Sequence, residues 1–422
     1  MKLSKYSIFH NENGKNYIFH QVSHALLKID DELAEYLQTK DIDKLPKEIK
    51  GQLETSGFIV DNNVDETCAI KYANLVNRYN SKLLRITILP TINCNFRCWY
   101  CYEHHKPSLM SEENAHAILE FIKHEVTEKK IEEIVLDWFG GEPLLRFSQI
   151  IYPLSKELKN WSEKHEVKFK NIITTNGSLI DENMAEKMNE IGLFSFQITL
   201  DGGKEHHNKV RSSLAMKNSY DVIVKNIHIL CRVLDKPNIE LRINYTKENI
   251  DSAFNIFDDF DKEIRHYILI SPHIVWQQID NIAVLKEKVD ELRNSAYEKG
   301  FNIIMQNSMN RCATCYTENM EQFVINYDMN VYKCTARDFN NKFCIGQITK
   351  DGKFIPNELY YRYYTTLSPF FNKECMECNL LPSCLYSISC IQKKIERAEP
   401  KCNKTDIIKS LHNVITYKIR RL

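Results

Sequence analysis

Three cysteines stand close together in the stretch TINCNFRCWYCYEHH (residues 91–105), at Cys94, Cys98 and Cys101. A structural zinc site takes four protein ligands, and a disulfide framework takes an even number of cysteines. Three thiols within eight residues therefore indicate a metal centre that leaves one coordination position for another molecule. More candidate ligands come late in the chain, where nine of the fourteen cysteines fall between residues 312 and 402.

The composition narrows the setting of this chemistry. With 422 residues, the chain is long enough for two or three domains with cores of their own. Its 56 Lys and Arg balance its 56 Asp and Glu, so we expect neither a nucleic-acid partner nor a membrane. No apolar run has the length of a signal peptide or a membrane span, which favours a cytoplasmic protein. Because that compartment keeps thiols reduced, metal ligation is the expected use of the cysteines.

Alternating strands and helices are predicted to position the first three cysteines. Amphipathic stretches such as residues 111–126 and 221–234 separate β-branched apolar runs, which are LLRITILP, EIVLDWFG, NIITTNG, FSFQITLDG, IELRINYT, HYILISP and FNIIMQ. Repeated strand–helix–strand units predict a parallel sheet with right-handed crossovers. About 220 residues are few for an eight-fold barrel. The predicted fold class is therefore α/β, with a partial (β/α)6 TIM-like barrel as its core.

Unusual residues directly follow four of these predicted strands. The cysteines follow the first strand, GGEP (140–143) the second, TNG (175–177) the third and DGG (201–203) the fourth. In folds of this kind ligands bind at the carboxyl ends of the strands. We therefore expect the four segments to meet in one site.

The Cys94-x3-Cys98-x2-Cys101 spacing after a first strand resembles the signature of the radical S-adenosylmethionine (SAM) enzymes. In that family the three cysteines hold a [4Fe–4S] cluster, whose fourth iron binds SAM. Reductive cleavage of SAM gives a 5′-deoxyadenosyl radical that abstracts hydrogen from a substrate. The resemblance implies SAM contacts at the matching positions Tyr100, Gly140, Gly141, Glu142, Pro143, Asn176, Thr199, Arg211 and Asn244.

Several of these positions also have an ordinary structural interpretation. The two glycines suit any strand-to-helix turn, although Glu142 is not needed for one. Tyr100 could serve loop packing, Arg211 could be a solvated charge, and Asn176 and Asn244 could be turn or cap residues. Agreement of four strand ends with one family pattern favours the functional interpretation.

The late cysteines resemble the SPASM extension, which carries two auxiliary [4Fe–4S] clusters. The family pattern implies Cys312, Cys315, Cys334 and Cys390 as ligands of the first cluster, and Cys375, Cys378, Cys384 and Cys402 as ligands of the second. Three clusters and SAM are thus the expected cofactors. The five residues between Cys384 and Cys390 exceed the usual family spacing, and the pair Cys312 and Cys315 is tight. Cys344 is a spare thiol or a substitute ligand, and a zinc ribbon over 375–402 remains an alternative, because four thiolates suit either metal.

Four domains are expected from the changes in pattern along the chain. Residues 1–80 resemble a small α+β peptide-recognition (RRE-like) domain, 81–308 the radical SAM core and 309–404 the SPASM domain, with a C-terminal helix over 405–422. Recognition domains of this kind bind a leader peptide as an added edge strand. The stretch NYIFH (16–20) is the candidate docking strand. The alternative is an N-terminal cap that only covers the barrel.

The resemblances imply a maturase of a ribosomally synthesised precursor peptide with a leader. Hydrogen abstraction would form a thioether or carbon–carbon crosslink, with flavodoxin or ferredoxin as electron donor. Sulfatase maturases carry an aspartate directly after the cysteine that matches Cys334, whereas here Thr335 follows and Asp338 is the nearest acid. Oxidation of a protein Cys or Ser, as in those enzymes, is the alternative, and a non-catalytic iron–sulfur adaptor is a third. No catalytic residue is identified, because the fold alone does not select a product.

Overall fold

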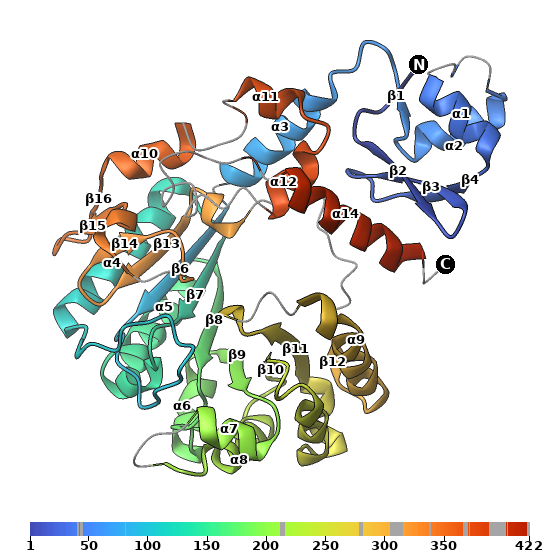
Figure 1. Ribbon diagram of the computed structural model, residues 1–422. Coiled ribbons are helices and arrows are strands. Elements are labelled where there is room, and N and C mark those ends of the chain that lie inside the picture. Colours follow the sequence, from blue (N-terminus) through green and yellow to red (C-terminus); the bar gives the residue numbers. More distant parts are fainter. Residues whose placement is uncertain are drawn as a thin grey trace. The chain divides into compact units, whose positions relative to one another are not determined.

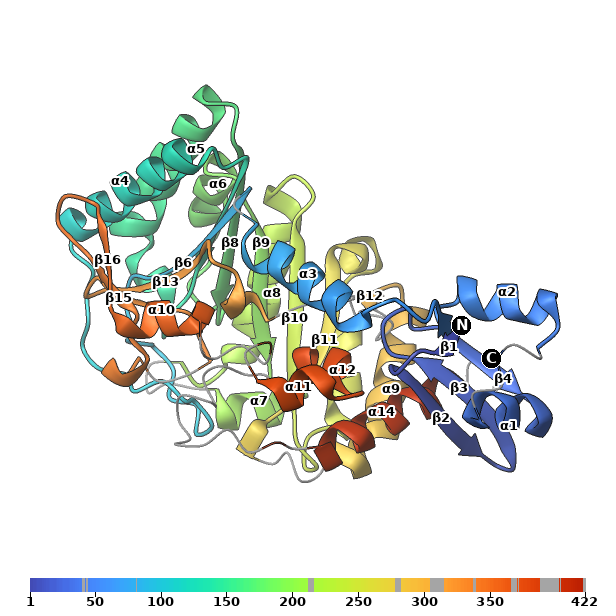
Figure 2. The same cartoon turned by 90° about the horizontal axis from the view of Figure 1, so that it is seen from above.

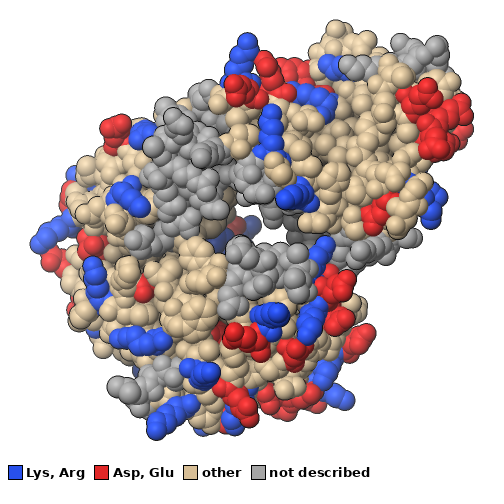
Figure 3. All heavy atoms as spheres, in the orientation of Figure 1, with Lys and Arg blue, Asp and Glu red and all other residues tan. Residues whose placement is uncertain are grey.

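The computed structural model describes residues 1–39, 42, 45–80, 82–211, 216–277, 282–303, 315–336, 339–365, 370, 372–387, 402 and 404–419. The chain divides into two compact units. The larger unit comprises residues 81–306 and 321–357, and the smaller comprises residues 1–80, 307–320 and 358–422. On the face drawn in Figure 3, acidic and basic side chains are interspersed, as expected from equal numbers of both. No helix among the described residues is long and apolar enough to cross a membrane.

A mostly parallel sheet forms the centre of the larger unit (Figure 1). Its parallel strands lie side by side in chain order, as successive crossovers on one face produce. This arrangement confirms the predicted α/β class with a partial barrel. The strands are β6 (Leu83–Leu89), β7 (Glu133–Trp138), β8 (Lys168–Thr175), β9 (Leu193–Leu200), β10 (Asn238–Tyr245), β11 (Ile268–Ile274) and β12 (Asn302–Ile303).

Helices between the strands form a layer against this sheet, which Figure 2 shows from above. The predicted helices at 111–126 and 221–234 are confirmed as α4 (Glu112–Lys129) and α8 (Ser219–Val233). Ser111 fixes the start of α4, because its side chain accepts a hydrogen bond from the backbone N–H of Asn114. Between β10 and β11 the expected α-helix is replaced by two 3-10 helices, η4 (Asp251–Asp259) and η5 (Lys262–Tyr267). The remaining connections carry α5 (Tyr152–Lys164), α6 (Glu182–Glu190), α7 (Lys204–Val210) and α9 (Ile282–Glu298).

A second group of strands extends the sheet beyond β6. Strand β13 (Gln322–Asn326) pairs in parallel with β6, and all five of its residues are buried. The Lys129 ammonium forms an ion pair of 2.8 Å with Glu321, directly before β13. The antiparallel strands β14 (Asn330–Tyr332), β15 (Gly346–Ile348) and β16 (Phe354–Pro356) complete this side. Residues 321–357 thus belong to the larger unit.

The smaller unit contains an antiparallel sheet in the order β2 (Ser7–Glu12), β3 (Lys15–His20) and β4 (Leu26–Ile29). Its core includes Ile18, Leu37 and Phe58. Because β3 is the central strand and pairs on both sides, the prediction that NYIFH supplies the docking edge is wrong. The sequence pattern indicates a strand there but not which neighbours flank it. The other elements of this segment are β1 (Lys2–Leu3), α1 (Asp31–Thr39), α2 (Lys47–Thr55), β5 (Ile59–Val60) and α3 (Glu66–Arg78).

The late helices belong to the same smaller unit. The predicted C-terminal helix at 405–422 corresponds to α14 (Lys404–Ile419). It buries Ile407, Leu411 and Ile415, which share one face at four-residue spacing, against Phe19 of β3. Among the described residues, three shorter helices precede it, α10 (Glu358–Thr365), α11 (Lys373–Glu377) and α12 (Leu381–Ser387).

Candidate active site

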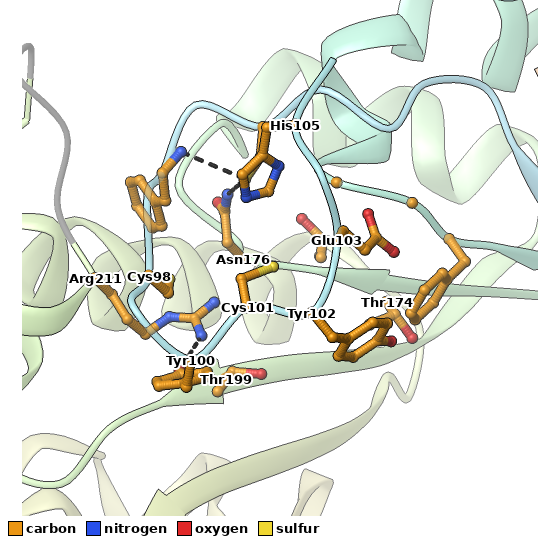
Figure 4. A pocket seen from close by; sticks show the side chains of 16 residues that line it. Cys98, Tyr100, Cys101, Tyr102, Glu103, His105, Thr174, Asn176, Thr199 and Arg211 are labelled. Atoms are coloured by element: carbon orange, nitrogen blue, oxygen red, sulfur yellow. Dashed lines mark hydrogen bonds between the residues drawn. The ribbon is translucent and has the colours of Figure 1, made fainter. Parts of the chain in front are cut away.

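A cavity in the larger unit lies where strands β6 to β9 end (Figure 4). Residues from all four of the segments that follow these strands line it or contact its lining. The lining includes most of the residues predicted from the sequence, namely Cys94, Cys98, Tyr100, Cys101, Gly140, Gly141, Asn176, Thr199 and Arg211. The other three predicted residues, Glu142, Pro143 and Asn244, stand behind this lining and contact its members or neighbours.

The three cysteines share this cavity, as their spacing predicts. Burial raises the pKa of each thiol, that of Cys94 to about 12, so binding of a metal centre must displace protons. The backbone N–H of Phe96 donates to Cys94 Sγ at 3.3 Å, a bond of the kind that stabilises a ligating thiolate. Within the described part of the chain, no three Cys, His, Asp or Glu side chains converge tightly enough for a single metal ion. Three thiols around one cavity suit a cluster, whose ligands bind separate irons.

The Gly-Gly turn after β7 packs its backbone against the cysteine loop. Gly140 has a φ of 126°, and a Cβ atom there would lie 2.2 Å from the carbonyl oxygen of Thr91. A Cβ atom at Gly141 would lie 2.3 Å from the carbonyl oxygen of Asn93. The Glu142 N–H donates to that same Asn93 carbonyl at 2.8 Å. Both glycines are therefore required for the turn to support the loop that carries Cys94.

Glu142 joins the ends of β7 and β8. Its side chain is fully buried and accepts from the Thr175 hydroxyl at 2.7 Å, the Leu144 N–H at 3.0 Å and the Asn176 N–H at 2.7 Å. Burial raises the pKa of Glu142, although these three hydrogen bonds oppose the shift. Three donors of the chain thus occupy the carboxylate, which fixes the position of the Gly-Gly turn. Pro143 begins the short 3-10 helix η2 (Pro143–Arg146) behind it.

A hydrogen-bonded group surrounds the Tyr100 hydroxyl, which donates to Asp201 Oδ2 at 2.6 Å. The hydroxyl oxygen accepts from Arg211 Nη1 at 2.8 Å and from Asn244 Nδ2 at 3.1 Å, and Figure 4 shows Arg211 directed at Tyr100. Burial alone would lower the pKa of Arg211, but Tyr100, Cys98 and Asp201 raise it. Arg211 is thus a fixed cation at the cavity. The sequence indicated Asp201 only as part of the DGG segment that follows β9.

Glu103 is a lining residue that the sequence reasoning missed. Its side chain is 8% exposed, and neither carboxyl oxygen has a hydrogen-bond partner. Burial raises its pKa to about 8. The available signal was its position two residues after Cys101, which places it beside any group held by the cysteines. Glu103 is therefore available to hydrogen-bond a molecule bound in the cavity.

The comparison with known families agrees with this geometry. Residues 88–260, which contain the cavity, match the family described as the radical SAM superfamily. The chain carries a radical SAM domain. The cofactors of such a domain are a [4Fe–4S] cluster and SAM, and a lining with three cysteines and the buried Arg211 cation fits this pair. The chain is accordingly that of an enzyme with a radical SAM domain.

Curated relatives of this chain include maturases. The cysteine-type anaerobic sulfatase-maturating enzyme of Clostridium novyi is 26% identical over 340 residues, which cover 72% of this chain and 87% of that protein. The radical SAM cyclopropyl synthase TigE of Paramaledivibacter caminithermalis is 21% identical over 451 residues, which cover 93% of this chain and 90% of that protein. The Fe-coproporphyrin III synthase of Methanosarcina barkeri is 29% identical over 178 residues, and the match spans 40% of its length and 41% of this chain.

Two solved structures share the fold. Native anSMEcpe with bound AdoMet aligns with a TM-score of 0.54 at 19% identity, covering 70% of this chain and 86% of that chain. Streptococcus suis SuiB bound to its precursor peptide SuiA aligns with a TM-score of 0.52 at 15% identity, covering 96% and 99%. At these identities the likeness concerns the fold.

The late cysteines are only partly described. Cys312, Cys390 and the nearby acid Asp338 lie outside the described residues. Cys315 belongs to the smaller unit and Cys334 to the larger, and Cys344 donates its thiol hydrogen to the carbonyl of Gly346 at 3.2 Å. The predicted second ligand set belongs wholly to the smaller unit. Cys375 lies on α11, Cys378 directly follows α11, Cys384 lies on α12, and Cys402 precedes α14.

Proposed function

We propose that this radical SAM enzyme modifies a ribosomally synthesised precursor peptide, forming a thioether or carbon–carbon crosslink. The observation that carries the proposal is the N-terminal antiparallel sheet, whose outer strands β2 and β4 offer edges to which a leader peptide could add. Similarity to TigE over 93% of the chain and the fold shared with peptide-bound SuiB support it. The substrate and the type of crosslink are part of the proposal.

In the proposed reaction the bound cluster and SAM supply a radical that abstracts a hydrogen atom from the peptide. The chain itself contributes binding and orientation. Cys94, Cys98 and Cys101 would hold the cluster. Gly140 and Gly141 line the cavity with backbone, and their missing side chains make room for the loop that carries Cys94. The Arg211 cation and the Thr199 hydroxyl are the groups proposed to bind the SAM carboxylate. The apolar rings of Phe96, Tyr102 and Phe139 in the lining exclude water from the reacting atoms.

The late cysteines are proposed to hold two auxiliary [4Fe–4S] clusters, which would supply an acceptor for the electron that crosslinking releases. Cys312, Cys315, Cys334 and Cys390 would bind the first cluster, and Cys375, Cys378, Cys384 and Cys402 the second. A flavodoxin or ferredoxin would deliver the electron needed for each SAM cleavage. Domain boundaries at 80, 308 and 404 remain part of this proposal.

The corrected candidate for the docking edge is β4. His20 N–H donates to the carbonyl of Ala25 at 3.0 Å, so the alternation of an antiparallel pair directs the Lys28 N–H away from β3. Lys28→Pro removes this outward donor, whereas Lys28→Ala removes only the charged side chain. We expect the proline variant, but not the alanine variant, to weaken binding of the leader in a fluorescence titration. Equal binding by both variants would exclude β4 and leave β2 as the edge to test.

The direct test is incubation of the reduced, reconstituted enzyme with SAM and a precursor peptide encoded beside its gene. Either crosslink removes two hydrogen atoms, one from each joined position, and mass spectrometry detects this loss. The second candidate is oxidation of a cysteine or serine in a sulfatase, favoured by similarity over 87% of the C. novyi maturase. Thr335 at the position of the expected aspartate counts against it. Formylglycine in a sulfatase-derived peptide, with the precursor unchanged, would replace the first proposal with the second.

A further inference from the structure

The segment that carries three late cysteines lies directly against the N-terminal sheet within the smaller unit. Gln21, which follows β3, is 5% exposed and uses both ends of its amide in this contact. Its Nε2 donates to the carbonyl of Asn379 at 2.8 Å, and its Oε1 accepts from the Ser383 hydroxyl at 2.8 Å. Nε2 also donates to the carbonyl of Tyr6 at 3.0 Å. Gln21 therefore joins the N-terminal segment to the turn between Cys378 and Cys384.

A second group of bonds holds the turn between Cys375 and Cys378. The carbonyl of Met376 accepts from Lys5 Nζ and from the Thr67 hydroxyl, each at 3.2 Å. Lys5 also donates to Thr67 Oγ1 at 2.5 Å, so the two side chains support one another. Both donors come from the N-terminal segment, and one of them is charged, which strengthens its bonds.

Apolar contacts reinforce these hydrogen bonds. Cys378 and Cys384 pack against the cluster formed by Phe19, Leu380, Ile407, Leu411 and Ile415. Phe19 belongs to β3, and the three last residues belong to α14, which begins just after Cys402. The N-terminal sheet thus holds both chain segments that carry the predicted ligands, the α11–α12 segment and the start of α14.

The donor set fits a four-iron cluster. Its four members are thiols, three of them half-buried and Cys402 exposed, and burial against hydrocarbon limits access of water to the sulfurs. The Leu380 N–H donates to Cys378 Sγ at 3.4 Å, as backbone donors do to ligating sulfurs.

We infer that the N-terminal domain is a structural part of the second auxiliary metal centre, with Gln21 as the residue that positions its cysteine loop. The inference rests on the proposed function for the existence of that centre. It follows that the N-terminal segment is not an independent peptide-binding attachment. Removal of its contacts should release the second auxiliary cluster while the centre at Cys94 in the larger unit remains intact.

The test compares three anaerobically reconstituted full-length variants. Gln21→Met keeps the volume of the side chain and removes its hydrogen bonds. Asn16→Leu is the matched control, because the Asn16 amide also uses both ends, toward Asn11 and Asp31, away from the cysteine loop. Ser383→Ala removes one of the same bonds from the loop side. The readouts are iron per chain after a chelator challenge, the electron paramagnetic resonance spectrum after reduction, and peptide-independent SAM cleavage.

We expect about twelve irons in the wild type and in Asn16→Leu, and about eight in Gln21→Met with SAM cleavage retained. Ser383→Ala should lose iron to the chelator faster than Asn16→Leu. If Gln21→Met fails to fold, this comparison tests the inference. Wild-type iron content and chelator resistance in the Gln21 and Ser383 variants would overturn this inference but not the proposed auxiliary centres. A wild-type protein with about four irons would refute the auxiliary centres, and the inference with them.

Discussion

Replacement of Glu142 by glutamine is expected to loosen the connection between β7 and β8 at the centre of the site. The carboxylate accepts from Thr175 and Leu144 through one oxygen and from Asn176 through the other. In Glu142→Gln the single amide oxygen can accept either from Thr175 and Leu144 or from Asn176. The amide NH2 group then faces the remaining donor or donors. Asn176, at the end of β8, loses its acceptor if the oxygen stays with Thr175 and Leu144.

The size of the effect follows from the bonds that change. Loss of a hydrogen bond to a charged acceptor costs about 1.5–3 kcal/mol, and a buried unpaired donor costs about 1–3 kcal/mol. Burial raises the pKa of Glu142, so removing its charge returns part of this cost. A net cost of about 2 kcal/mol corresponds to a roughly 30-fold rise in local opening, since about 1.4 kcal/mol is a factor of ten.

Amide hydrogen exchange at Asn176 measures this opening directly, because the Asn176 N–H is itself the donor to Glu142. Peptides covering residues 173–178 should exchange about 30-fold faster in Glu142→Gln than in the wild type. Glu132→Gln is the control, since Glu132 is 64% exposed and pairs with Lys82 at the surface. Such pairs contribute about 0–1 kcal/mol, so little change is expected there. Exchange at Asn176 within about twofold of wild type would refute the structural role assigned to Glu142.

Three further outcomes are expected. Burial raises the pKa of Asp137 on β7 from 3.8 to about 6, so stability should fall as pH rises between these values, by about 3 kcal/mol in total. The free energy of unfolding of Asp137→Asn, measured in urea at pH 4 and pH 7, should not show this decrease. A variant whose stability depends on pH as the wild type does would contradict the prediction. Tyr100→Phe leaves Arg211 and Asn244 without their shared acceptor and should weaken SAM binding about 10-fold or more in calorimetry. An unaltered affinity for SAM would show that the Tyr100 hydroxyl and its partners do not contribute to SAM binding. Gly140→Ala places a Cβ atom against Thr91 and should reduce iron retention, and normal iron content would show that the turn can relax.

Most of the site could be predicted because its signals are local. Each segment directly follows an apolar, β-branched run, and parallel strands bring such segments to one edge of a sheet. The trio of Cys94, Cys98 and Cys101 needs only a loop of the right length after β6. Side-chain orientation was less accessible. Nothing in the letters GGEP shows that the Glu142 carboxylate is occupied by Thr175 and Asn176 rather than directed into the cavity.

Strand neighbours were the part of the fold that the sequence did not specify. The run NYIFH reads as a strand, but its central place between β2 and β4 depends on pairings that period-two patterns do not encode. The parallel addition of β13 to β6 joins residues more than 230 positions apart, Arg85 and Gln322 among them. Glu103 could not be predicted as a lining residue, because an acidic residue in a loop is ordinarily solvated. Only the burial of its carboxyl oxygens without a hydrogen-bond partner distinguishes it.

Cys94, Cys98 and Cys101 are expected to hold the cluster at which SAM is cleaved. The most direct measurement compares the wild type with a variant in which all three cysteines are alanine, reconstituted anaerobically and supplied with SAM and dithionite. The variant should lose about four irons per chain and form no 5′-deoxyadenosine, while the remaining iron stays bound. Formation of 5′-deoxyadenosine by the triple variant at the wild-type rate would contradict the account.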